Sequence, residues 1–234
     1  MTQADQSISF PRPDGQSAPG HAFAAADPKA PAIIVIQEWW GINDQIRGVA
    51  RRLCDAGYNV LIPDLYRGKI ASSSDEAQHL MDSLDFPDAL FQDLAGAVSL
   101  TREHHGKVAV MGFCMGGALA LAAAVHLTEL SAAVCFYGIP PEQLADPSKL
   151  SVPLLAHFAD HDDWCTPERV QTLEAQLRHA TAEYELHRYS AQHAFFNEAR
   201  PEVYDPQAAT TAWRRTLEFL GRHLGAPAST NTAA

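Results

Sequence analysis

Residues 107–125, KVAVMGFCMGGALALAAAV, decide how the rest of the chain is read. The apolar run 108–111 is long enough for a buried strand but too short for a helix. The segment after the glycines is rich in alanine and leucine, which favour a helix. Between the two, the pattern Gly112-x-Cys114-x-Gly116 matches a sharp strand-to-helix turn that carries a nucleophile. We therefore predict a strand, a tight turn at Cys114 and a helix.

This turn would give Cys114 the properties of a nucleophile. Glycines at 112 and 116 are expected because a Cβ would clash in so sharp a turn. The positive end of the following helix favours the thiolate form of Cys114, and the backbone N–H of Met115 can bind an oxyanion. The alternative is a structural cysteine buried beside a glycine-rich turn, and the residues further along the chain decide between the two readings.

The composition predicts one α/β domain over residues 1–225. The chain has 234 residues, of which 47% are hydrophobic and 19% charged, so there is ample material for a core. Residues 1–30 contain short strand-like pieces between prolines and glycines, and we expect peripheral N-terminal strands there. The last residues, 226–234, are expected to form a flexible tail.

Charge and cysteine usage exclude several kinds of partner. The net charge of −11 argues against binding to nucleic acid or to an anionic membrane surface. Because no long apolar run and no signal-like start are present, we expect a cytoplasmic monomer or small homo-oligomer. The four cysteines are not spaced as a metal site or a disulfide framework, and we expect no metal and no cofactor. Cys54 and Cys135 are interpreted as core residues, while Cys165 is left unassigned.

Strands and helices are expected to alternate along most of the chain. This pattern predicts a mostly parallel sheet with helices on both faces, in which reactive residues gather beyond the carboxyl ends of the strands. Strands are predicted at 32–37, 59–62, 108–111, 132–137, 152–158 and 184–189, and helices from Asn43 or Asp44 to Gly57, from about Asp75, and at 86–103, 115–125, 167–179 and 208–224.

A nucleophile of this kind needs a histidine base and an acid that orients it, in the chain order nucleophile, acid, histidine. After Cys114, the next strand end with carboxylates offers Asp160, Asp162 and Asp163. His193 follows in the loop after the last predicted strand. His157 reads as a hydrogen-bonded core histidine, although the stretch 157–163 could instead bind a metal.

A second patch, Glu38-Trp39-Trp40, follows the predicted strand at 32–37 and is expected at the same sheet edge as Cys114. Trp39 can donate a second N–H to an oxyanion, and the two tryptophans can form a wall for a flat substrate. The alternative is ordinary core packing, with Glu38 as a helix cap.

Five stretches together resemble the dienelactone hydrolase family of α/β-hydrolases, the carboxymethylenebutenolidases. The likeness extends over residues 31–220. The stretches are QEWWGIND at 37–44, PDLYRG at 63–68, MGFCMGG at 111–117, HFADHDDWCTPE at 157–168 and YSAQHAFFNEARPEVY at 189–204.

The resemblance implies an α/β-hydrolase fold and a Cys-Asp-His triad that hydrolyses an unsaturated lactone through an acyl-cysteine. The family's cysteine, histidine and aspartate fall on Cys114, His193 and Asp162, and its glutamate on Glu38. Ala159 stands where the family's aspartate motif has glycine. In that family the resting cysteine is held as a neutral thiol near the glutamate until substrate binds.

We expect substrate contacts at Trp39, Trp40, Phe113 and Asn197. Family members that act on dienelactone grip its carboxylate with arginines, and Asn197 occupies one of those places. An amide does not replace a guanidinium, so a less charged lactone or small ester is expected. The alternatives are a thioesterase or aryl esterase on the same triad, or a ligand-binding protein without catalysis.

Overall fold

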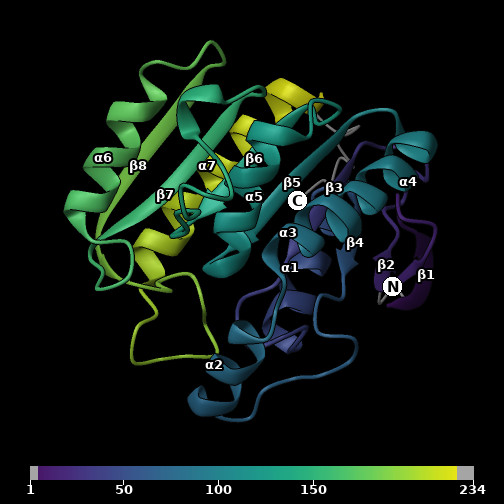
Figure 1. Cartoon of the computed structure of the whole chain (residues 1–234), viewed down its shortest axis with the longest axis horizontal. Helices are drawn as coiled ribbons and strands as arrows, with labels where there is room; N and C mark the ends of the chain where they lie inside the picture. The colour runs from purple at the N-terminus through teal and green to yellow at the C-terminus, as the bar shows by residue number, and fades with distance from the viewer. Residues whose placement is uncertain (1–4, 226–234) are drawn as a thin grey trace, which may run out of the picture.

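One eight-stranded sheet, in the order β1-β2-β4-β3-β5-β6-β7-β8, forms the centre of the computed structural model, which describes residues 5–225 (Figure 1). The six strands from β4 and β3 through to β8 are parallel, whereas β2 is antiparallel to β4 and to β1. The strands are β1 (Gln6–Pro11), β2 (Ser17–Phe23), β3 (Ala32–Ile36), β4 (Asn59–Pro63), β5 (Val108–Phe113), β6 (Ala132–Phe136), β7 (Leu154–His161) and β8 (Tyr184–Gln192).

Helices cover both faces of this sheet. The buried side chains of α4, α5 and α6 share one hydrophobic cluster, and those of α1 and α7 share another on the opposite face. The helices are α1 (Asp44–Asp55), α2 (Ser74–Asp82), α3 (Phe86–Asp88), the π-helix η1 (Ala89–Leu94), α4 (Ala95–His105), α5 (Met115–His126), the 3-10 helix η2 (Pro147–Lys149), α6 (Pro167–Leu177) and α7 (Pro206–Leu224).

The predicted α/β architecture is confirmed, because each expected strand and helix is present. All five residues of β3 are buried, as expected of a β-branched strand in the middle of a parallel sheet. The side chain of Asn43 caps α1 by accepting a hydrogen bond from the N–H of Ile46 at 3.2 Å. The last two strands run three residues further than predicted, which brings Asp162 and His193 directly to their ends.

The helix predicted at 86–103 is interrupted. A six-residue π-helix, η1, lies between α3 and α4 in an otherwise continuous helical run. The spacing of hydrophobic residues predicted which face of this helix is buried, but such spacing does not show where a helical turn is locally wider. The only buried polar side chain of η1, Asp93, belongs to the ionic network that holds the N-terminal hairpin.

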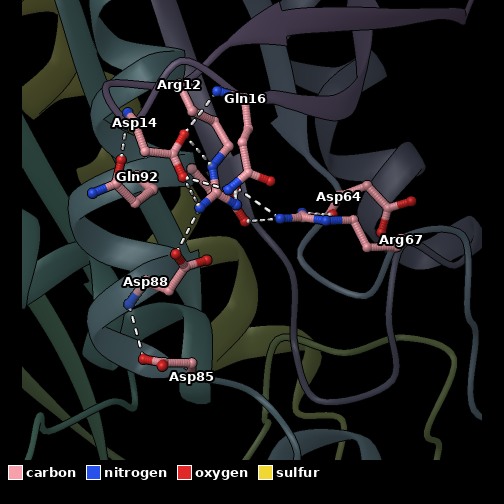
Figure 2. A network of polar contacts seen from close by, with 9 residues as sticks. Arg12, Asp14, Gln16, Asp64, Arg67, Asp85, Asp88 and Gln92 are labelled. Carbon is pink, nitrogen blue, oxygen red and sulfur yellow. Dashed lines mark hydrogen bonds and ion pairs between the residues drawn. The ribbon is translucent and has the colours of Figure 1, made fainter.

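The first two strands form the predicted hairpin and extend the edge of the central sheet through β4. Its turn is fixed by Arg12, whose guanidinium pairs with Asp88 at 2.6 Å and with Asp93 at 3.1 Å. Arg67 pairs with Asp93 at 2.8 Å from the other side. Figure 2 shows that this network joins the hairpin turn, the η1 region and the loop after β4.

Over residues 5–225, no helix is both long and apolar enough to cross a membrane. The tail predicted at 226–234 lies outside the described residues.

Candidate active site

Cys114 stands in a strained turn between β5 and α5. Its φ of 54° and ψ of −118° lie in a region that residues with a side chain rarely adopt. The glycines on either side make the turn possible. A Cβ on Gly112 would collide with the carbonyl oxygen of Gly116, and one on Gly116 would collide with that of Gln37. The predicted strand, turn and helix are therefore present, and the side chain of Cys114 is partly exposed at the helix N-terminus.

The structure brings Asp162 and His193 together from the ends of β7 and β8. The Nδ1 atom of His193 lies 2.7 Å from Oδ2 of Asp162. The other carboxylate oxygen, Oδ1, accepts the backbone N–H groups of Trp164 and Cys165 at 2.7 and 2.8 Å. Of the three candidate aspartates, Asp162 is thus the one that contacts His193, since Asp160 pairs with Arg188.

Electrostatics favour a charged imidazole here. Burial disfavours the imidazolium form of His193, but hydrogen bonding and charge from Asp162 and Cys114 outweigh burial and raise the pKa of His193 to about 10. Burial likewise acts to raise the pKa of Asp162, yet the contacts with His193 and the two backbone N–H groups lower it below its usual value. Asp162 is therefore held as a carboxylate beside His193.

The second ring nitrogen of His193, Nε2, is buried and has no hydrogen-bond partner among residues 5–225, Sγ of Cys114 included. Cys114 is nevertheless close enough to raise the pKa of His193. The sulfur and the imidazole are therefore neighbours, and both border the same cavity.

Glu38 is buried at this edge and is held by two neutral donors. The hydroxyl of Tyr137 donates to Oε1 at 3.0 Å, and the side-chain amide of Asn197 donates to Oε2 at 2.6 Å. Burial raises the pKa of Glu38, and these two hydrogen bonds only partly oppose that effect. Tyr137 itself has a positive φ of 39°, a strained conformation of the kind that gathers at functional sites.

The cavity has a volume of about 240 Å³ and is lined mainly by apolar and aromatic side chains. Trp39 contacts Trp40 and Trp164 edge-to-face, with ring centroids 5.3 and 5.9 Å apart. Met115 is the first residue of α5, where a backbone N–H has no intrahelical partner, and Trp39 lies in the loop after β3. The cavity is bordered by Glu38, Trp39, Trp40, Met81, Phe86, Cys114, Met115, Tyr137, Trp164, Cys165, Arg169, His193 and Arg200, with further small residues.

Two of the four residues predicted to contact substrate do not line the cavity. Phe113 is fully buried and stacks on Phe136 and Phe196 at 4.7 and 5.4 Å, because its position on β5 faces the α1 and α7 side of the sheet. Asn197 is 1% exposed, and its side-chain amide donates a hydrogen bond to the carboxylate of Glu38. Trp39 and Trp40 do line the cavity, as predicted.

Several cavity residues were missed from the sequence. Trp164, 52% exposed, follows Asp162 by two positions, and Tyr137 directly follows β6. Their places at strand ends are the signal that could have indicated them. The arginine pair of the cavity, Arg169 and Arg200, comes from α6 and the loop after β8, where no motif distinguishes these residues from surface arginines.

The metal reading of residues 157–163 is not supported. Both ring nitrogens of His157 are engaged, by the hydroxyl of Tyr189 at 2.9 Å and that of Thr216 at 3.1 Å. The described part of the chain holds no group of three or more histidine, cysteine, aspartate or glutamate side chains placed to bind a metal ion. His157 is the hydrogen-bonded core histidine that was expected.

A parallel sheet covered by helices on both faces, with a strained turn, a histidine and an aspartate at its carboxyl edge, defines an α/β-hydrolase fold. The dienelactone hydrolase family model matches residues 19–224. The chain therefore belongs to the dienelactone hydrolase family, and it is a hydrolase.

Individual relatives agree with this assignment. "Protein usf" of Aquifex pyrophilus is 33% identical over 85% of this chain and 92% of its own length. A "Putative carboxymethylenebutenolidase" of Aquifex aeolicus is 31% identical over the same shares. Among solved structures, a "Putative Dienelactone Hydrolase" from Klebsiella pneumoniae is 26% identical, with a TM-score of 0.82 over 95% of this chain and all of the other.

Proposed function

We propose that the protein hydrolyses lactones or small carboxylic esters through an acyl-cysteine formed on Cys114. One observation carries this proposal. Cys114 and His193 border one cavity, and Nδ1 of His193 lies 2.7 Å from Oδ2 of Asp162. This supports a nucleophile, a base and a group that orients the base acting together, as acyl transfer requires.

The first half of the reaction forms the thioester. As the sulfur of Cys114 attacks the carbonyl carbon of the substrate, its proton passes to Nε2 of His193, and the oxyanion binds the backbone N–H groups of Met115 and Trp39. One such donor typically lowers the barrier by about 3 kcal/mol. As the C–O bond breaks, the leaving alkoxide or enolate takes a proton from Nε2 of His193.

The second half releases the acid. His193 removes a proton from a water molecule, which attacks the thioester carbon, and the departing sulfur takes that proton back from Nε2 to restore the thiol. Asp162 holds the imidazole in the tautomer whose Nε2 is free to exchange protons, and its negative charge stabilises the imidazolium. The chain's own residues thus supply each proton transfer that hydrolysis needs.

The lining of the cavity favours a small, flat and negatively charged substrate. Its volume of about 240 Å³ and its tryptophan walls suit an unsaturated or aryl ester. Arg169 and Arg200 both border it, so a substrate carboxylate would find guanidinium groups despite the asparagine at 197. This lining favours an anionic substrate over the less charged ester expected from the sequence.

Turnover of p-nitrophenyl acetate and of dienelactone by the wild type and by Cys114→Ala tests the proposal. We expect loss of more than about 1,000-fold in the variant, because removal of a nucleophile leaves only binding and oxyanion contributions. Cys54→Ala, which removes a thiol on the buried face of α1, is the matched control and should keep its activity. Equal turnover by wild type and Cys114→Ala would sink the mechanism.

The same assay separates the alternative functions. Hydrolysis of aryl esters or thioesters without any lactone hydrolysis would identify a thioesterase or aryl esterase on the same triad. Binding of esters without turnover by the wild type would indicate a ligand-binding protein that retains the fold.

A further inference from the structure

Trp164 is a large aromatic residue that is exposed beside the cavity. It borders the cavity and is 52% exposed, whereas the cavity residues Met115 and Tyr137 are 5% and 1% exposed. Within residues 5–225, the other large hydrophobic residues with comparable exposure are Ile70 and Phe91, and neither borders the cavity. An exposed aromatic ring at the edge of a pocket is a surface on which a ligand can pack.

The backbone of Trp164 is held on both sides, so the position of its ring is defined. Its N–H donates to Oδ1 of Asp162 at 2.7 Å, and its carbonyl oxygen accepts a hydrogen bond from the guanidinium of Arg169. The indole packs edge-to-face on Trp39, which packs in the same way on Trp40. The exposed ring therefore does not have to be ordered when a ligand binds, which reduces the entropic cost of binding.

Trp164 is the exposed one of two aromatic neighbours of His193. The buried ring of Tyr137 contacts the imidazole edge-to-face, with centroids 5.0 Å apart, and the ring of Trp164 lies 6.4 Å from it. In the proposed reaction Nε2 of His193 gives its proton to the departing oxygen, so the leaving group lies next to this imidazole. Because Tyr137 is buried, the aromatic surface open to a leaving group beside His193 is that of Trp164.

We infer that Trp164 binds the leaving group of the substrate, and that this leaving group is a planar phenol or enol and not an aliphatic alcohol. The inference rests on the proposed function and adds which half of the ester the aromatic surface recognises. A flat ring can stack on the indole, whereas a short aliphatic group covers little of it. Because the indole is open to solvent, leaving groups that extend beyond the cavity fit this subsite as well.

Two acetate esters with different leaving groups test this assignment. Phenyl acetate and trifluoroethyl acetate form the same acetyl-enzyme, so the ratio kcat/KM compares binding and acylation alone. Trp164→Ala should lower kcat/KM about 10-fold for phenyl acetate, the equivalent of one aromatic contact, and less than about twofold for trifluoroethyl acetate. Trp164→Phe should retain most of the activity on phenyl acetate. Phe91→Ala, which removes an aromatic residue of similar exposure outside the cavity, is the control and should change neither value.

A third ester determines which half of the substrate meets Trp164. Trifluoroethyl benzoate carries its ring on the acyl group, and its kcat/KM should respond to Trp164→Ala no more than that of trifluoroethyl acetate. A loss for the benzoate equal to the loss for phenyl acetate would place Trp164 at the acyl group and overturn the inference. Equal losses for all three esters, or no loss for any of them, would overturn it as well.

A binding experiment distinguishes failure of this inference from failure of the proposed function. Acetanilide, the amide counterpart of phenyl acetate, carries the ring in the place of the leaving group, and calorimetry measures its binding without turnover. The dissociation constant should rise about 10-fold in Trp164→Ala and stay unchanged in Phe91→Ala. Equal binding by Trp164→Ala and the wild type would overturn the inference and leave hydrolysis untouched. Weaker binding by Trp164→Ala, in a protein that hydrolyses no ester, would refute the proposed function and with it the leaving-group role.

Discussion

Individual residues at the site divide into those that a motif identifies and those that only the fold can place. The positions of Cys114 and His193 at the cavity were predictable because one sits in a glycine-flanked turn and the other follows the last strand. The choice of Asp162 over its neighbours Asp160 and Asp163 depended on the resemblance, and the contact with His193 now supports it. The role of Asn197 could not be predicted, because its partner Glu38 is 159 positions away.

Asp162→Asn tests the orienting role of this carboxylate. The amide keeps the shape but lacks the charge that holds the imidazole tautomer, so turnover should fall by about 1,000- to 10,000-fold. Asp163→Asn is a matched control in the same loop, since Asp163 is exposed, and its turnover should change less than about twofold. Ester hydrolysis under saturating substrate measures both. Similar losses in the two variants would assign the effect to the loop instead of to the His193 contact.

Arg200→Gln tests the preference for an anionic substrate. Arg200 borders the cavity, and its guanidinium carbon lies 5.7 Å from the centre of the Trp40 ring. Loss of a charge-assisted hydrogen bond should raise KM about 10-fold for an ester that carries a carboxylate and leave a neutral ester nearly unchanged. Arg178→Gln, at the exposed end of α6, is the control. An equal change in KM for both esters would mean that Arg200 does not bind the carboxylate.

At the scale of elements, periodicity and capping residues predicted the strands and helices well, because each core-facing pattern repeats within one element. The serine cap before α2 and the asparagine cap before α1 are examples. The π-helix η1 was not predicted, since its wider turn does not change the spacing of the hydrophobic residues. The ionic network around Arg12 was not predicted either, because it joins three elements that are distant in the chain.

Arg12→Gln tests how much this network stabilises the fold. The side chain of Arg12 is 7% exposed and that of its partner Asp93 is 2% exposed, so the substitution leaves a buried carboxylate with Arg67 as its remaining cation. We expect the free energy of unfolding to fall by about 2–3 kcal/mol, somewhat less than for a buried pair without a second cation.

Urea denaturation measures this loss, with Arg214→Gln as the control. Arg214 pairs with Glu218 on the exposed face of α7, and removal of such a surface pair should cost less than about 0.5 kcal/mol. Comparable losses for the two variants would show that the Arg12 network contributes no more than a surface ion pair.

At the scale of the whole molecule, parallel strands bring residues from five loops to one edge, and this is why strand ends predicted that Cys114, His193 and an aspartate lie near one another. The strand ends did not predict which side chains line the cavity, because α2, α6 and the loop after β8 approach the cavity from outside the sheet. Two histidines make the stability of the fold depend on pH in opposite directions. Folding lowers the pKa of His157, which lies in the core, and raises the pKa of His193, which lies at the cavity.

His157 and His193 together predict a maximum of stability near pH 6.5. Burial holds the pKa of His157 well below its usual value, so below about pH 6.5 the unfolded chain binds a proton that the folded protein does not. The pKa of His193 is raised to about 10, so its contribution is complete below about pH 6.5 and is lost as the pH rises towards 10. Each effect changes the free energy of unfolding by at most about 1.4 kcal/mol per pH unit.

Urea denaturation across this range, in the wild type and in single variants, separates the two contributions. His157→Gln should flatten the acidic side of the profile and His193→Gln the alkaline side, whatever their effect on overall stability, because each removes one difference in proton uptake. His104→Gln, on the exposed end of α4, should leave both slopes unchanged. An alkaline slope that persists in His193→Gln would mean that the imidazolium at the cavity is not what couples folding to pH.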